Sequence, residues 1–213
     1  MLSLTNSNKQ YVKINGENYE LNLAYDNVLR WFELLDTNLS EQAKVVQTFL
    51  MFVGEVKNAN ADDYINVFQK VQRIATEHPY GNGEVTNKPA TKKDAEDQAI
   101  EAWYNRPFDY KIDAGAIYAS FMYDYHIDLI EQQGKLSWYK FKSLLDNLSD
   151  KSPLMRIVQI RKTDMGQIAK DYKDNPKYIG AVTDQKDYYS LAQTPEERQA
   201  KKDYELGKAM EQL

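Results

Sequence analysis

The stretch of sequence that decides the fold runs from residue 108 to residue 163 and reads FDYKIDAGAIYASFMYDYHIDLIEQQGKLSWYKFKSLLDNLSDKSPLMRIVQIRKT. Apolar residues recur in it at the three- and four-residue steps that place side chains on one face of a helix. Asp109 is placed to cap a long helix that continues to about Glu131. The expected apolar face of this helix comprises Ala114, Ile117, Phe121, Tyr125 and Leu129. Tyr118 and Met122 add a second apolar row, so we expect the helix to be central and covered on more than one side.

Two shorter helices are expected in the rest of this stretch. Ser137 is a suitable N-cap for a helix whose apolar face comprises Trp138, Phe141, Leu145 and Leu148. Ser152 followed by Pro153 is a strong helix start, because Pro is favoured at the first helical position. The apolar run in residues 154–160 also fits a β-strand, but the Ser-Pro start favours a helix.

The N-terminal segment alternates between apolar and polar residues, which is typical of β-strands. Asn15-Gly16 lies in its middle and is the pair preferred in two-residue type I′ turns, since both residues there need positive φ. We therefore predict a β-hairpin from Gln10 to Leu23. A lone hairpin is only marginally stable in water, so it must lie on another element or pair with another chain.

Three amphipathic helices are expected between the hairpin and residue 78. The first carries Val28, Phe32 and Leu35 on one face. The second follows Ser40 as N-cap, and its expected core stripe comprises Ala43, Val46, Leu50, Val53 and Val56. The third starts near residues 60–62, and its expected inner face comprises Tyr64, Phe68, Val71 and Ala75. Three such helices in short succession predict a small bundle.

Turn and capping residues indicate the remaining segments. Residues 79–91 are rich in Gly, Pro and Asn and are typical of an exposed loop. Thr91 with Asp94 resembles a capping box that opens a helix through Trp103. Residues 165–189 fit no element clearly. Thr194-Pro195-Glu196-Glu197 is a helix start, with a cap, a Pro and a capping-box acid together.

The sequence thus predicts an all-α protein, mainly a helical bundle, with a small N-terminal β-hairpin. We expect the hairpin and a three-helix lobe in residues 1–78, a linker in residues 79–91, and a helical core in residues 92–163. A polar C-terminal extension should occupy residues 164–213, with an exposed helix from about residue 195.

The composition argues against several classes of function. The chain has no cysteine, which excludes disulfides, thiolate metal sites and a cysteine nucleophile. The formal net charge of -5 argues against general nucleic-acid binding, which depends on Lys and Arg contacts to phosphate. There is no secretory signal and no apolar stretch of about 20 residues that could span a bilayer. We expect a cytoplasmic protein that binds neither nucleic acid nor membrane.

No arrangement of reactive side chains in the sequence predicts catalysis. The histidines are His78 and His126, and His126 stands between Asp124 and Asp128. A general base or metal ligand oriented by a carboxylate is one interpretation, but a catalytic His needs further convergent groups. Acids one turn apart are more typical of a solvated helix face. We therefore expect no catalytic, cofactor-binding or metal-binding residues and no enzyme activity.

Partner binding is the remaining role for the aromatic and basic residues of the second half. The candidates are Tyr118, Met122, Trp138, Phe141, Arg156 and Arg161. For Trp138 and Phe141 the alternative is core packing, because apolar residues at helical spacing usually face inward. Arg156 and Arg161 flank an apolar run, so each is expected to pair with acids of the long helix that follows Asp109, or with an acidic partner.

Residues 108–163 closely resemble the bacteriophage gp-fifteen family. The resemblance rests on Phe108-Asp109, on residues 117–121 and 124–129, on Leu136-x-Trp138-x-x-Phe141, and on Ile157-x-x-Ile160-Arg161. The N-terminal half is similar only in its general plan of a hairpin followed by helices. The segment after Met165 departs from the family pattern in being longer and richer in Tyr.

The resemblance implies a tail-assembly chaperone of long-tailed phages and prophages of Gram-positive bacteria. Such a chaperone coats the tape-measure protein until the tail tube polymerises around it, and it is absent from the mature virion. Self-association, or several copies on each client, is expected, with the major tail protein as a further candidate partner. A structural tail component, such as a completion or adaptor protein, is the alternative, and a small metal-dependent hydrolase is a weaker one.

Overall fold

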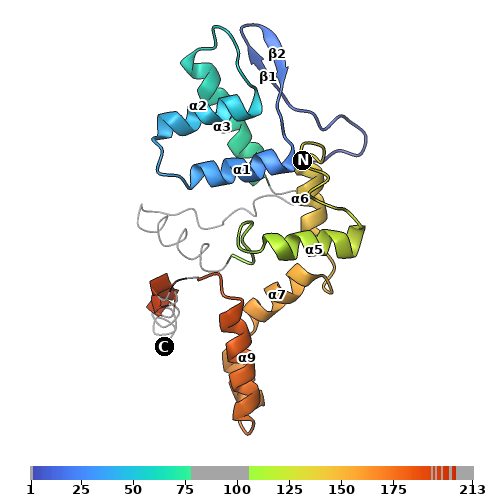
Figure 1. The fold of residues 1–213 in the computed structure, drawn as a ribbon, viewed down its shortest axis with the longest axis vertical. Coiled ribbons are helices and arrows are strands. Elements are labelled where there is room, and N and C mark those ends of the chain that lie inside the picture. The colour runs from blue at the N-terminus through green and yellow to red at the C-terminus, as the bar shows by residue number, and fades with distance from the viewer. Residues whose placement is uncertain are drawn as a thin grey trace, which may run out of the picture. The chain divides into compact units, whose positions relative to one another are not determined.

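A computed structural model describes residues 2–77 and 106–192, together with residues 194, 196, 197, 199–201, 203 and 204. The chain is mainly helical with one small antiparallel hairpin, which confirms the predicted fold class. The strands are β1 (Tyr11–Ile14) and β2 (Glu17–Glu20). The helices drawn in Figure 1 are α1 (Tyr25–Leu35), α2 (Glu41–Phe52), α3 (Ala61–Thr76), α5 (Ala114–Tyr125), α6 (Trp138–Asp146), α7 (Pro153–Lys162), α8 (Met165–Asp171) and α9 (Pro176–Tyr188).

The described residues form two compact units. The first comprises residues 2–77 and 126–147, and the second comprises residues 106–125 and those from 148 onward. The N-terminal lobe therefore shares its core with α6, a helix from within the predicted 92–163 segment.

The predicted hairpin is confirmed in the first unit. Its turn places Asn15 at φ 51° and Gly16 at φ 89°, the positive values that a type I′ turn requires. Val12 and Ile14 point into the core, and Ile14 is only 1% exposed. The Asn15 side-chain amide donates to the carbonyl oxygens of Lys57 and Asn58, and Lys70 Nζ donates to the Tyr11 carbonyl at 2.6 Å. The hairpin thus lies on α3 and the loop before it.

Aromatic packing among α1, α2, α3 and α6 forms the core of the first unit. Trp31 is 1% exposed, and its indole N–H donates to Thr48 Oγ1 at 2.9 Å. Phe49 stacks on Tyr64 with ring centroids 4.2 Å apart, and Tyr25 stacks on Phe141 at 4.8 Å. A polar group buried without a partner is costly, so the Trp–Thr bond fixes how α1 meets α2.

The core face predicted for α2 is wrong. Val46 is 43% exposed and Leu50 is 38% exposed, whereas Thr48, Phe49 and Phe52 are buried. The helix carries two adjacent apolar faces, and the aromatic face has the larger area to remove from water. The helix also ends at Phe52, before the remaining predicted core residues Val53 and Val56.

The long helix predicted from Asp109 to about Glu131 is also wrong in its ends. The helical residues are Ala114–Tyr125, and the Asp109 carboxylate instead accepts from the N–H groups of Lys111 and Ile112 in a preceding turn. His126 follows at φ 54°, a left-handed conformation that ends helices. Asp128 then accepts from the Ile130 and Glu131 N–H groups, which stabilises a new turn instead of further helix.

Helices α5 and α7 form the centre of the second unit. Ser152 caps α7 with Pro153 at its start, so the helix predicted there is confirmed over the strand. Ser120 Oγ on α5 accepts from the Leu154 N–H at 2.9 Å, and both residues are buried. Asp113, just before α5, binds Arg161 of α7 through two bonds of 2.8 Å.

The segment left unassigned by the sequence forms the helices α8 and α9. Further on, Thr194 and Glu197 exchange side-chain bonds to each other's backbone N–H groups, which confirms the predicted capping box. The expected loop at 79–91, the helix through Trp103, and His78 lie outside the described residues.

Candidate protein-interaction surface

The side chains most suited to chemistry have structural partners. Asp124 accepts from the N–H of Ser149 at 2.8 Å and from its hydroxyl at 2.7 Å. The Asp128 carboxylate accepts from backbone N–H groups in the turn that follows His126. Within residues 2–77, 106–192 and the described positions beyond, no three His, Asp or Glu side chains are grouped so that they could hold a metal ion.

The six candidate partner-binding residues fall in both units. Trp138 and Phe141 lie in the core of the first unit, at 1% and 0% exposure, which matches the core-packing alternative. The other four lie in the second unit. There Arg161 is bound to Asp113, and Met122 is 39% exposed on α5. Tyr118 is half-buried on α5 and Arg156 is exposed on α7.

A helical hairpin with almost no core of its own extends the second unit. No residue of α8, of α9 or of the turn between them is buried. Figure 1 shows that α9 projects from α7, with the turn between α8 and α9 at the end farthest from α7. Helices this short are marginal in water without packing. Among the described helices of the second unit, α8 and α9 are therefore the least packed.

Capping residues, more than hydrophobic burial, define the α8–α9 hairpin. The Asp164 carboxylate accepts from the Gly166 and Gln167 N–H groups at the start of α8. Asn175 Oδ1 accepts from the Tyr178 N–H at 3.1 Å, and Pro176 takes the first position of α9. These caps satisfy N–H groups that would otherwise lack acceptors.

Two cationic side chains form hydrogen bonds at the base of this hairpin, the end where α8 begins and α9 ends. Lys186 Nζ donates to the Thr163 carbonyl at 2.6 Å, and Arg161 Nε donates to the Tyr189 carbonyl at 2.6 Å. The same Arg161 guanidinium holds Asp113. Charge-assisted bonds of this kind are strong and directional. The hairpin is therefore attached through its base, and its far end contributes only exposed side chains.

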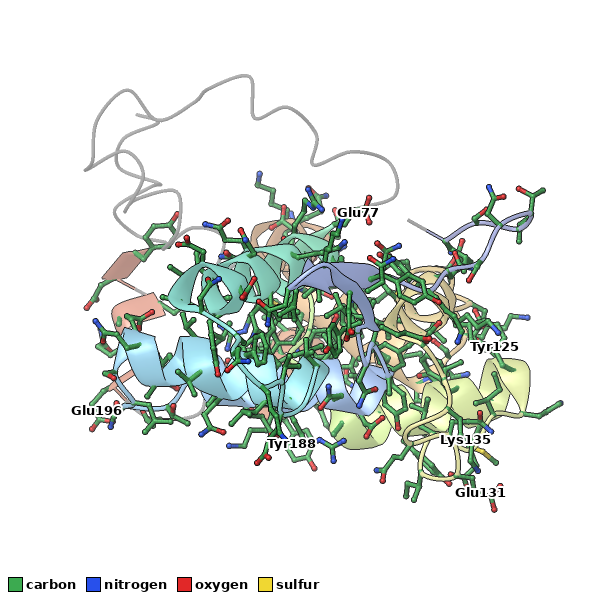
Figure 2. All side chains as sticks on the ribbon, turned by 90° about the horizontal axis from the view of Figure 1, so that it is seen from above. Glu77, Tyr125, Glu131, Lys135, Tyr188 and Glu196 are labelled. Carbon is green, nitrogen blue, oxygen red and sulfur yellow. The ribbon has the colours of Figure 1, made fainter. Side chains whose placement is uncertain are left out.

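Tyrosines mark both ends of α9. Tyr172 and Tyr178 contact each other at the far end, with ring centroids 4.3 Å apart, and they are 42% and 40% exposed. Tyr188 at the base packs edge-on against Tyr189 and is 81% exposed (Figure 2). On α5, Tyr123 is 54% exposed beside Met122. Tyr and Met are enriched where proteins meet. Tyr buries a large area at low entropic cost, and Met is flexible enough to fit irregular surfaces.

Sequence reasoning did not find the α8–α9 hairpin. Its helices carry few aliphatic residues, so they lack the periodicity that indicates a core-facing helix. The signals that were present are short-range: Asp164 before α8 and Asn175-Pro176 before α9. The exposed tyrosines could have been located from these caps.

Comparison with known proteins identifies the family. The family model described as Bacteriophage Gp15 protein matches residues 6–191. The chain belongs to the bacteriophage Gp15 family. The Gp15 match includes the N-terminal lobe and also residues 165–191, so the tyrosines of α8–α9 lie within the family region.

Membership of the Gp15 family makes the chain a phage structural or morphogenesis protein. No match was found among curated proteins or among solved structures. In the part of the Gp15 chain that the structure describes, no helix is both long and apolar enough to cross a membrane.

Proposed function

We propose that the chain is a tail-assembly chaperone that binds the phage tape-measure protein and keeps it competent for assembly during tail-tube formation. Its place of action is the host cytoplasm, and it leaves before the virion is complete. The observation that carries the proposal is the set of exposed Tyr and Met side chains in the second unit, in a protein of the Gp15 family. The proposal assigns the chain no catalytic step.

These exposed Tyr and Met side chains are suited to binding a long helical client. Tyr172, Tyr178 and Met122 are each about two-fifths exposed, so each offers apolar area without forming one large patch. Such side chains re-pack against many client segments, which a chaperone for a long polypeptide needs. Several copies on one client gain avidity from individually weak sites.

Co-expression with the tape-measure protein tests the proposal. We expect the client to become soluble and to co-elute with several copies of this chain. Replacing the tyrosine pair at the far end of the α8–α9 hairpin, as Tyr172→Ser with Tyr178→Ser, should abolish or strongly reduce co-elution. Tyr11→Ser is the matched control, because Tyr11 is exposed to a similar degree, 46%, but lies on β1 in the first unit.

A client that stays insoluble and does not co-elute with the unaltered chain contradicts the proposal. The alternative is a structural component of the tail, such as a completion or adaptor protein, which family membership also supports. Mass spectrometry of purified virions separates the two functions. A structural component is retained in the particle, whereas a chaperone is absent from it.

A further inference from the structure

The outward face of α9 has an unusual composition. The half-buried residues of α9 are Ile179, Val182 and Lys186, which mark its inner face. At 100° per residue, the opposite face carries Lys177, Ala181, Asp184 and Tyr188, all exposed. Their spacing of four, three and four residues is that of a helix-pairing seam. This outward stripe has a cation near one end, an anion toward the other, and a small residue between them.

Both charges of the outward stripe lack a counter-ion in the described residues. Lys177 and Asp184 are exposed, and neither takes part in an ion pair within this part of the chain. They are seven residues apart, about 10 Å along the helix, which is too far for them to pair with each other. Lys186, by contrast, is bound to Thr163 at the base of the hairpin.

Between Lys177 and Asp184, small residues allow another helix to approach the backbone of α9 closely. Gly180 and Ala181 lie midway between Lys177 and Asp184. A Cβ atom built on Gly180 would meet nothing within 4 Å. Small residues at a crossing point allow two helices to come close together, which shortens the reach needed by flanking side chains.

We propose that the outward stripe of α9 is a docking surface for a second copy of this chain. Two α9 helices packed antiparallel about a two-fold axis near Gly180–Ala181 place Lys177 of each copy beside Asp184 of the other. The same patch then serves both copies, as a closed two-fold interface requires. A parallel arrangement would instead place like charges side by side. The charge pattern therefore selects a second copy as the occupant and fixes its direction.

The dimer formed through this stripe is a weak one. Thirteen-residue helices such as α9 are about 20 Å long, and a single pair of them buries less than the roughly 1,600 Å² of a standard interface. Association should therefore depend on concentration, and it should weaken with added salt because the paired charges are solvent-exposed.

Charge reversal tests the proposal on the full chain without any client. Sedimentation velocity from about 1 to 500 µM at low salt covers the range expected of a weak interface. Lys177→Glu and Asp184→Lys should each weaken dimerisation about fivefold or more, because every change affects two symmetric pairs. The double variant Lys177→Glu with Asp184→Lys should return to within about twofold of the unaltered chain. Lys170→Glu on α8 is the control for net charge and should have no such effect.

Cross-linking gives a second measurement that does not depend on charge. The chain has no cysteine, so Ala181→Cys introduces a single thiol next to the proposed axis. Mild oxidation should give a disulfide-linked dimer, since two thiols near a two-fold axis meet each other. Ala114→Cys, exposed at the start of α5, should give little.

A chain that is monomeric throughout the concentration range overturns the proposal. So does a dimer that survives both single reversals, or a double variant that fails to recover association. Because no client is present, these outcomes are independent of the co-expression result, and the tyrosine pair tested there is not altered here.

Discussion

At the scale of single residues, the Arg161 guanidinium connects α7 to the segment before α5 and to the residue that follows α9. It binds both carboxylate oxygens of Asp113 at 2.8 Å and also donates to the carbonyls of Pro107 and Tyr189. The sequence shows Arg161 among apolar neighbours and predicts a pair with an acid of the long helix after Asp109, or with an acidic partner. It did not identify Asp113, because the pairing spans 48 residues and depends on how α5 packs on α7.

Removing this guanidinium should unfold the second unit at lower denaturant. We expect Arg161→Ala to lower the free energy of unfolding by about 3–5 kcal/mol, because it leaves the buried Asp113 carboxylate without its counter-ion. Arg156→Ala, on the exposed side of the same helix, should change it by less than about 0.5 kcal/mol. Urea titration followed by circular dichroism measures both variants. Equal effects would show that the Asp113–Arg161 pair contributes little.

Tyr25 gives the first unit a dependence on alkaline pH. Burial raises its pKa above the ordinary 10.0, with the Asp26 and Asp128 carboxylates adding to the shift. The neutral phenol donates to the Leu129 carbonyl at 2.6 Å. A pKa raised in the folded state means that its stabilising effect is complete below pH 10 and is lost as pH rises through the folded pKa. The melting temperature should therefore fall above pH 10, and less steeply in Tyr25→Phe.

At the scale of helices and strands, short-range signals correctly predicted where several elements begin. Ser40, Asn60 and Ser152 cap the helices expected after them, and Asn15-Gly16 forms the expected turn. These signals act within a few residues, so the sequence contains all the information they need. The inward face of α2 depended on α1 and α3, because Phe49 stacks on Tyr64 and Thr48 binds Trp31.

Substitutions on the two faces of α2 should have unequal effects. Phe49→Ala is expected to lower the free energy of unfolding by about 3–5 kcal/mol, because it leaves a cavity at a fully buried site. Leu50→Ala should cost less than about 1 kcal/mol, since Leu50 is already 38% exposed. Tryptophan fluorescence during urea unfolding compares them, with Trp31 beside the site. A larger loss for Leu50→Ala would support the core stripe first expected from spacing.

At the scale of the whole molecule, contacts between distant segments decide which helices share a core. Tyr25 bonds to the Leu129 carbonyl across 104 residues of sequence, and Trp138 donates to the Leu23 carbonyl. Such contacts explain why residues 126–147 belong to the first unit. Periodicity predicted helices in the N-terminal lobe and in residues 137–148. It carries no information on which of these helices pack against each other. The α8–α9 hairpin was missed for a related reason, since its helices carry few aliphatic residues and no buried ones.

Amide hydrogen exchange should divide the second unit of the isolated chain into a stable and a less stable part. We expect strong protection in α5 and α7, which are held by Ser120 and Arg161, and weak protection in α8 and α9, where no residue is buried. Protection of α9 should rise with protein concentration if the proposed second copy covers its outward stripe. Protection of the turn at Tyr172 should rise only when the client is added. Strong protection of α8 and α9 in the dilute chain would show that the hairpin is stable without a partner, and the argument for both docking surfaces would then lose its physical basis.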